Sequence, residues 1–329
     1  MMTTPKLSAI IGLYNQMNDR FMTGGYAPYR SMLEMVEIAG KQALARGLEF
    51  THGEEGDLNL RSLPEVKARL AQYGMVVSGV NPNLWGQPRW GKGTLGANDA
   101  ATRAQAVDYI RSVIDLATAA DCAYVGLWPG QDGHDYYFEV DYGRVFEWWA
   151  SALQTLADHN PQVRLGLEFK PYEPRAYSFI NSAAKTLLLL EAVNRPNVGV
   201  CFDVGHSLYG GENLGEVVAM CQRKGRLFHL HLNDNYGNWD WDLNVGSVHF
   251  LAYVEMMYWL RRTGYDGWYS MDIFSYRLDP TDSMAESLHW TKALHDVIDR
   301  IGMDKLDGLL AAGDPIATSK FFREWLFRA

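Results

Sequence analysis

The chain has 329 residues, of which 47% are hydrophobic and 21% are charged, and its net charge is -9 at pH 7. This composition indicates a globular protein with room for one large α/β barrel or two average domains. The acidic balance argues against a nucleic-acid partner, which usually requires a basic face. No apolar run approaches the roughly 18 residues of a membrane-spanning helix, so we also expect no membrane partner.

The cysteines and the N-terminus bear on location. Cys122, Cys201 and Cys221 show no spacing typical of a metal site. The N-terminal apolar run is too short for a signal peptide. Both features favour free thiols in a reducing compartment, and we expect a cytoplasmic protein.

Short apolar strands alternate with amphipathic helical stretches along the chain. We expect strands at residues 7–14, 47–52, 75–81, 124–128, 164–169, 198–203, 227–233 and 268–274. Apolar residues with helical spacing lie between and after them, at about 29–45, 64–73, 98–120, 140–158, 178–193, 213–224, 248–263 and 281–300. Eight such pairs predict a single α/β domain, a (β/α)8 TIM barrel over residues 1–300. An open doubly wound sheet is the alternative, but no Gly-rich phosphate fingerprint follows the first strand.

The C-terminal residues 301–329 contain no strand pattern. We expect them to form one or two helices outside the barrel, as a C-terminal helical extension. Aromatic and aliphatic residues crowd its end: Phe321, Phe322, Trp325, Leu326 and Phe327. They would pack either on the chain's own barrel or on a neighbouring subunit.

Four consecutive predicted strands carry a polar side chain at or near their carboxyl ends. These residues are Glu168, Asp203, His231 and Asp272. The carboxyl ends of barrel strands form the active site, so the four should converge. Carboxylates packed together raise each other's pKa, and a divalent cation removes that conflict. Mixed oxygen and nitrogen ligands suit Mn²⁺, Co²⁺ or Mg²⁺, with Zn²⁺ also possible. Separate salt-bridged core residues are the alternative.

The stretch GRLFHLHLNDNYGNWDWDLN, residues 225–244, contains a second candidate metal site. Asp240 and Asp242 stand two residues apart on its loop, while Asp203 and His206 stand three apart after the preceding strand, with a glycine bending the chain between them. His206, Asp240 and Asp242 would hold a second metal ion, with Asp203 bridging the two. The alternative is a solvated acidic loop.

Two histidines on the seventh predicted strand, His229 and His231, share one face because side chains alternate with a period of two. His231 is nearer the carboxyl end, so we interpret it as the metal ligand. We interpret His229 as a deeper, hydrogen-bonded histidine of the barrel.

Taken together, these residues resemble the xylose isomerase-like TIM-barrel superfamily. They are most similar to its two-metal aldose–ketose isomerases, xylose isomerase and L-rhamnose isomerase. LEFKPYEPR resembles the Glu-x-Lys-Pro-x-Glu-Pro segment of xylose isomerases, and FDVGH resembles the acidic-x-x-His step. LFHLHLND followed by DWDL resembles the strand-seven metal ligand and its Asp-x-Asp loop. NLWGQPRWGKGTLGAND and YVGLWPGQDG resemble segments that supply substrate-facing aromatic residues.

The sequence also departs from the xylose isomerase pattern. Xylose isomerases carry Glu and Asp where this chain has Asp203 and His231, whereas rhamnose isomerases carry Asp and His. The segment FTHGEEGD resembles the catalytic His–Asp region only loosely. The chain is also shorter than either enzyme, mainly in its tail.

The resemblance implies a metal-dependent sugar isomerase that moves a hydride between C1 and C2 of an open-chain monosaccharide. It implies two divalent metal ions, Mn²⁺ before Co²⁺ or Mg²⁺, and a homodimer or homotetramer. Lys170, near the carbonyl oxygen, would add positive charge where negative charge develops. A salt bridge to Glu173 is the alternative role for Lys170.

The resemblance also implies groups that open the sugar ring and line the substrate pocket. His52 would relay a proton during ring opening, with Asp57 orienting it, while Glu54 and Glu55 would be solvated.

Trp85 and Trp128 would wall the pocket and exclude water, although both also fit plain loop packing. Glu168 and His206 would contact the substrate as well as metal.

Rival functions exist on the same barrel. Ketose 3-epimerases of the superfamily use one metal and two Glu residues, one of them on strand eight, where this chain has the shorter Asp272. A dehydratase or lyase acting on a keto-sugar or cyclitol is a further alternative. The endonuclease branch needs a basic surface and more His ligands, and a barrel without catalysis would not need Lys170. The hydride-shift isomerase therefore remains our prediction.

Overall fold

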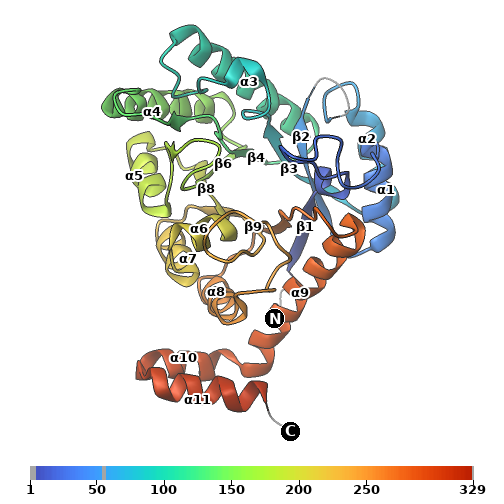
Figure 1. Cartoon of the computed structure of the whole chain (residues 1–329), viewed down its shortest axis with the longest axis vertical. Helices are drawn as coiled ribbons and strands as arrows, with labels where there is room; N and C mark the ends of the chain where they lie inside the picture. The colour runs from blue at the N-terminus through green and yellow to red at the C-terminus, as the bar shows by residue number, and fades with distance from the viewer. Residues whose placement is uncertain (1–4, 54–56, 328–329) are drawn as a thin grey trace.

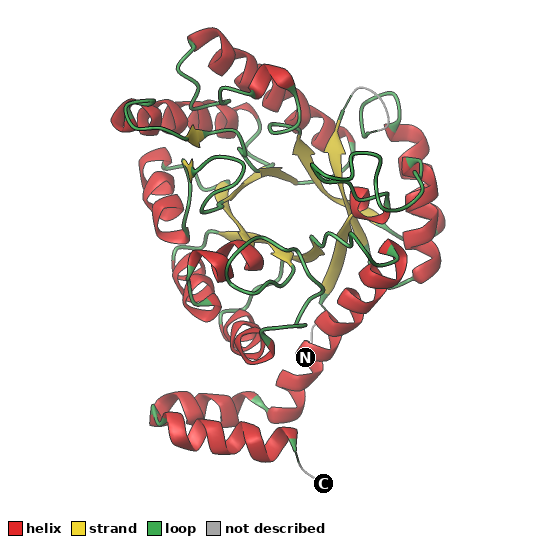
Figure 2. Cartoon of the chain, viewed as in Figure 1, coloured by secondary structure: helices red, strands yellow, loops and turns green. Residues whose placement is uncertain are grey.

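The computed structural model describes residues 5–53 and 57–327. Eight parallel strands close into a barrel in the order β1-β10-β9-β8-β6-β4-β3-β2, with helices around it (Figures 1 and 2). The strands are β1 Lys6–Ile10, β2 Gly47–His52, β3 Val76–Pro82, β4 Tyr124–Leu127, β6 Arg164–Glu168, β8 Val198–Asp203, β9 Leu227–Leu232 and β10 Trp268–Met271. The predicted (β/α)8 barrel is confirmed.

The predicted helices form the outer layer, because their apolar faces pack on the barrel and their polar faces meet solvent. They are α1 Met32–Gln42, α2 Leu63–Gln72, α3 Ala100–Ala119, α4 Tyr142–His159, α5 Ala183–Val193, α7 Leu214–Arg223, α8 Phe250–Arg262 and α9 Pro280–Ile301. Side chains of Asp99, Asp141 and Ser182 accept backbone N–H groups at three of their starts. No helix within the described residues has the length and apolar character to cross a membrane.

Several short elements differ from the predicted pattern. The first strand ends at Ile10, and its predicted continuation forms a 3₁₀ helix, η1 Ile11–Tyr14. A second 3₁₀ helix, η2 Pro88–Trp90, lies in the loop after β3, and helix α6 Val204–Gly210 begins directly after β8. A small antiparallel sheet joins β5 Gly133–His134 to β7 Tyr177–Ser178, which delays the start of α5. Local apolar periodicity does not distinguish such short elements from loops.

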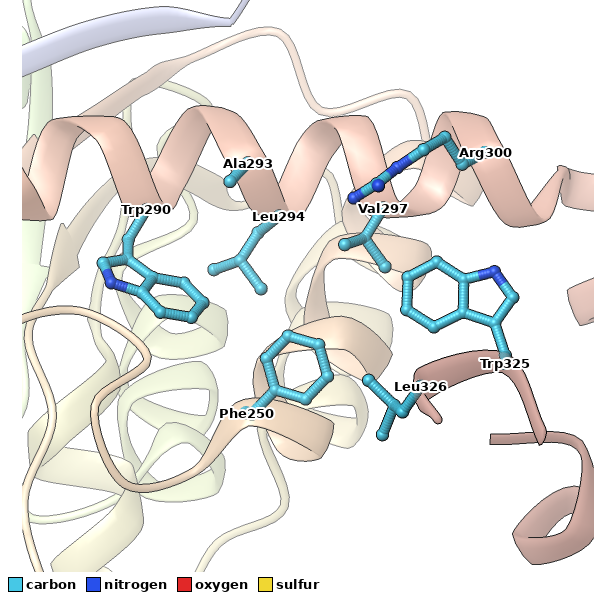
Figure 3. Close-up of a pocket in the computed structure, with 8 residues that line it drawn as sticks. All are labelled: Phe250, Trp290, Ala293, Leu294, Val297, Arg300, Trp325 and Leu326. Atoms are coloured by element: carbon cyan, nitrogen blue, oxygen red, sulfur yellow. The ribbon is translucent and has the colours of Figure 1, made fainter. Parts of the chain in front are cut away.

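The C-terminal helices α10 Met303–Ala312 and α11 Pro315–Leu326 form a hairpin that extends away from the barrel (Figure 1). In Figure 3, Trp325 and Leu326 of α11 face Phe250 of α8 and Leu294 of α9 across a cavity of about 470 Å³. No residue of α11 is buried. Through α10 the hairpin contacts α8 and α9 of its own barrel, and Asp307 of α10 pairs with Arg262 at 2.8 Å.

Candidate metal centre and active site

The first candidate metal group lies at the carboxyl-terminal ends of the strands. Glu168 ends β6, Asp203 ends β8, His231 lies on β9 and Asp272 directly follows β10. One ligand atom from each of the four lies within 4.8 Å of the others. His231 Nδ1 lies 3.2 Å from Glu168 Oε2 and 3.4 Å from Asp272 Oδ2. The structure thus brings together the four side chains that the strand pattern predicts.

The carboxyl groups of this group interact strongly. Burial, reinforced by the neighbouring Asp203 and Glu168, raises the pKa of Asp272 to about 8. Burial also raises the pKa of Asp203. Burial opposes ionisation of Glu168 too, but the His231 charge holds the pKa of that carboxyl below its usual value. Full ionisation of these carboxyls is unfavourable without added positive charge.

Orphaned ligand atoms show that the group fits a cation. Among the described residues, His231 Nδ1 is buried and has no hydrogen-bond partner, although it faces two carboxylates. A divalent cation accepts an imidazole lone pair and carboxylate oxygens together. The donor set therefore matches a divalent metal ion.

The second candidate group lies beside the first, at the start of α6 and on the loop after β9. Ligand atoms of Asp203, His206 and Asp240 all lie within 4.8 Å of one another, and His206 Nε2 lies 3.0 Å from Asp240 Oδ2. Gly205 lies in the first turn of α6, where the chain passes from strand to helix, and Asp203 caps this helix by accepting the His206 N–H at 2.9 Å. Gly205 is needed there because a Cβ would collide with Asn233 Oδ1.

Open ligand atoms also occur in this second group. His206 Nδ1 and Asp240 Oδ1 are buried without a hydrogen-bond partner in the described part of the chain. Although burial opposes it, the charges of Asp203 and Asp240 raise the pKa of His206 to about 9. The two carboxylates therefore favour the cationic form of the imidazole.

Asp242, the third predicted ligand of this group, lies near it without joining it. It has a left-handed backbone conformation (φ 46°), and its carbonyl accepts the Phe274 N–H at 2.9 Å. Burial, and then the charges of Asp240 and Asp272, hold the pKa of Asp242 well above its usual value. Among the described residues, Asp242 belongs to none of the groups of mutually close ligand atoms.

Lys170 is a buried cation at the edge of the second group. Its Nζ lies 2.8 Å from Glu173 Oε2 and 2.8 Å from Asp240 Oδ2, so the Glu173 salt bridge considered from sequence is present together with a second one. Burial opposes the charge, but Asp240 and Glu173 hold the pKa of Lys170 well above its usual value. The ammonium group is therefore charged at neutral pH.

Two tryptophans adjoin this lysine. The rings of Trp85 and Trp128 lie 5.2 Å apart at an interplanar angle of 48°, and Lys170 Nζ lies 5.0 Å from the Trp128 ring centre. Gln131 Nε2 donates to the Trp85 carbonyl at 2.9 Å, which anchors the loop after β3. The two rings thus pack on each other and form one wall beside the charged amine.

His52 ends β2, where its Nδ1 lies 3.0 Å from the hydroxyl of Tyr109 on α3. Asp57 packs against Gly53, where a Cβ would collide with its carboxylate, and burial raises the pKa of Asp57. Glu54 and Glu55 lie outside the described residues. The sequence analysis predicts that Asp57 orients the His52 ring. In the structure, Tyr109 contacts this ring.

One protein family matches most of the chain that carries this geometry. Residues 36–294 match the family described as the xylose isomerase-like TIM barrel. The chain belongs to this family. The predicted resemblance is thereby confirmed at the level of the family.

The relatives and solved structures that this chain matches carry the names of different enzymes. A xylose isomerase of Thermus thermophilus is 27% identical over 224 residues, which are 66% of this chain and 58% of that enzyme. The chain thus spans less than two thirds of the length of that curated relative. An L-ribulose 3-epimerase structure superposes with a TM-score of 0.68 at 16% identity, covering 90% of this chain and 96% of the epimerase. A D-tagatose 3-epimerase-like protein does so at 0.67 and 18%, covering 90% and 98%. These superpositions support the fold.

The sequence patterns did not single out Glu49, a fully buried carboxylate on β2 of this xylose isomerase-like barrel. His229 Nε2 lies 2.8 Å from Glu49 Oε2, and Tyr124 stacks on His229 with ring centres 4.3 Å apart. His229 is therefore a hydrogen-bonded histidine inside the barrel. A lone acidic residue within the apolar strand GLEFTH was the available signal, because an unpaired buried carboxylate is costly.

Proposed function

We propose that this chain is a metal-dependent aldose–ketose sugar isomerase that acts by a 1,2-hydride shift on an open-chain monosaccharide. The observation that carries the proposal is the second group, Asp203, His206 and Asp240, directly beside the four strand-end ligands. A buried, charged Lys170 adjoins the same Asp240. Family membership and the xylose isomerase relative support the same class of reaction.

Two divalent cations, with Mn²⁺ as the first choice, fit the donor sets of the two groups. Glu168, Asp203, His231 and Asp272 would hold one, and Asp203, His206 and Asp240 would hold the other, with Asp242 close beside them. When bound, such ions supply Lewis-acid charge to the oxygens of a substrate.

The chain's own residues supply the remaining requirements of the reaction. Lys170 Nζ donates to the carbonyl oxygen of the open-chain sugar and stabilises the negative charge that develops there. Trp85 and Trp128 exclude water from the same face. His52, held by Tyr109, moves a proton when the sugar ring opens.

A ketose 3-epimerase is the second candidate, favoured by one observation. The two 3-epimerase-related structures are matched over 96% and 98% of their own lengths. The reaction itself would then use Glu168 and Asp272 for proton exchange on carbon. A keto-sugar or cyclitol dehydratase on the same barrel is a third outcome to be tested.

The direct test of the proposed function is a turnover assay with metal-stripped protein. Pentoses, hexoses and 6-deoxyhexoses, each as aldose and ketose, are incubated with the protein before and after addition of Mn²⁺, and the products are identified by chromatography. We expect one aldose–ketose pair to interconvert only when Mn²⁺ is present. Formation of a ketose epimer alone would favour the epimerase, and a dehydrated product would favour the lyase.

We also propose that the chain works in the cytoplasm as a homodimer or homotetramer in which the α10–α11 hairpin contacts a second copy. The hairpin projects from the barrel (Figure 1), and Ile316 and Phe327 on it are 76% and 80% exposed. Sedimentation velocity on the full chain and on the double variant Ile316→Glu/Phe327→Glu tests the assembly. We expect an oligomer that the variant shifts toward monomer, and a monomeric wild-type chain would contradict this.

A further inference from the structure

Glu49 lies deeper in the barrel than the candidate ligands and accepts hydrogen bonds from several strands. Its carboxylate oxygens lie 2.8 Å from His229 Nε2, 3.1 Å from His231 Nε2, 2.7 Å from Asn81 Nδ2 and 3.0 Å from Ser270 Oγ. These donors stand on β9, β3 and β10.

The contact with Glu49 determines which nitrogen of His231 faces the candidate metal group. Asn81 Nδ2 donates to Glu49 Oε1, the same oxygen that His231 Nε2 faces, so this oxygen is an acceptor and His231 Nε2 carries the proton of their hydrogen bond. The other nitrogen, Nδ1, then points to Glu168 Oε2 at 3.2 Å and Asp272 Oδ2 at 3.4 Å. The His231 ring therefore lies between Glu49, which faces Nε2, and the ligand carboxylates, which face Nδ1.

We propose that Glu49 is a positioning residue that holds the Nε2–H form of His231 and so directs its Nδ1 lone pair to a divalent cation. The inference deepens the proposed function and rests on its metal site. A carboxylate behind a ligating imidazole fixes the ring orientation and increases its basicity.

The contact with Glu49 explains why a second histidine, His229, stands on the same strand face. It donates to Glu49 Oε2, while His231 donates to Oε1, so each oxygen of the carboxylate has an imidazole partner. Tyr124 stacks on the His229 ring with an interplanar angle of 11°. His229 and Tyr124 thereby keep Glu49 from rotating away from His231.

The test measures Mn²⁺ affinity of the metal-stripped protein by titration calorimetry, without any sugar. We expect Glu49→Gln to weaken Mn²⁺ binding by about 10- to 100-fold, the usual range for a lost partner behind a ligand. The matched control is Ser270→Ala, which removes a neutral donor to Glu49 and leaves His231 in contact, and we expect it to bind Mn²⁺ within about threefold of wild type. Thermal unfolding of both metal-free variants measures their general structural damage.

Several outcomes would overturn the inference. Unchanged affinity in Glu49→Gln would do so, and so would equal losses of affinity in both variants that follow their losses of stability. Absence of Mn²⁺ binding by the wild-type protein would remove the metal site itself. If the Mn²⁺ affinities of the wild-type protein and of both variants are as expected but no sugar is converted, the result contradicts the proposed function and leaves the inference standing.

A spectroscopic readout covers the case in which Glu49→Gln does not fold. In wild-type protein labelled with ¹⁵N-histidine and loaded with ¹¹³Cd²⁺, NMR coupling identifies the nitrogen bound to the metal. We expect His231 to bind through Nδ1 and to retain the proton on Nε2. Binding through Nε2 would contradict the role of Glu49.

Discussion

The two candidate ligand groups share Asp203 but are built differently. The first, which we call the strand group, stands on the barrel, where Asp203 and His231 are register partners of β8 and β9. The second, which we call the loop group, extends beyond the strands, because His206 comes from the first turn of α6 and Asp240 from the loop after β9. Barrel hydrogen bonds position the first group, whereas the second is held by its own ion pairs.

This difference separates two tasks. Ligands on strands are rigid and would hold a cation in every reaction that such a barrel supports. In the loop group, Asp240 pairs with both His206 and Lys170, so the ligands there are coupled to a candidate catalytic residue. We infer that the strand group determines whether metal binds and the loop group determines which reaction follows.

Removing a strand ligand should have the largest effect. Glu168→Gln keeps the side-chain volume but takes one negative charge from the first group, so we expect Mn²⁺ binding there and sugar turnover to fall by at least about 1,000-fold. Calorimetry and the turnover assay measure the two losses. A variant that keeps wild-type turnover would show that the strand group is structural.

The loop group should separate metal binding from reaction. Asp240→Asn combined with Asp242→Asn should abolish isomerisation while sparing the fold and leaving one Mn²⁺ per chain on the strand group. Metal analysis after gel filtration counts the ions, and circular dichroism checks the fold. Wild-type turnover in the double variant would remove the second metal from the account.

Lys170 should affect reaction more than metal binding. Lys170→Met keeps a long apolar stem beside Trp128 but removes the charge, so we expect turnover to fall by about 100- to 1,000-fold. Mn²⁺ affinity should not fall, because the variant loses a competing cation next to Asp240. A loss of turnover below about threefold would remove Lys170 from the mechanism.

His295, a buried histidine outside the two candidate groups, should have a smaller effect, and this effect is on the free energy of unfolding. Its pKa shifts in the opposite direction to that of His206. Burial lowers the pKa of His295 on α9 to about 4, whereas carboxylates raise that of His206. The unfolded chain protonates this histidine below about pH 6.5, so its contribution to the free energy of unfolding is present above that pH. As the pH falls toward 4, about 3 kcal/mol should be lost.

His295→Phe removes the titrating ring and keeps an aromatic group against Tyr269, whose ring centre lies 4.8 Å from that of His295. Urea unfolding of variant and wild type between pH 7 and pH 4 measures the difference. The variant should gain relative stability as the pH falls, and parallel profiles would contradict this assignment.

The sequence predicted the barrel because strand and helix periods alternate clearly along it. It also pointed to Glu168, Asp203, His231 and Asp272, since the fold places strand ends together. It missed α6, a seven-residue helix that local periodicity does not reveal. It missed Glu49 because the partners of that carboxylate, His229 and His231, lie about 180 residues away in sequence. Such pairings follow from barrel closure and not from local pattern.

The most direct test of the central claim is proton NMR of the Mn²⁺-dependent reaction in D₂O, after quenching and removal of the metal. A hydride shift keeps the migrating hydrogen on the sugar, so we predict aldose–ketose conversion without deuterium at C1 or C2. Deuterium at C3 of a ketose would contradict the account, because it would show proton exchange by a 3-epimerase and leave the loop group without its proposed role.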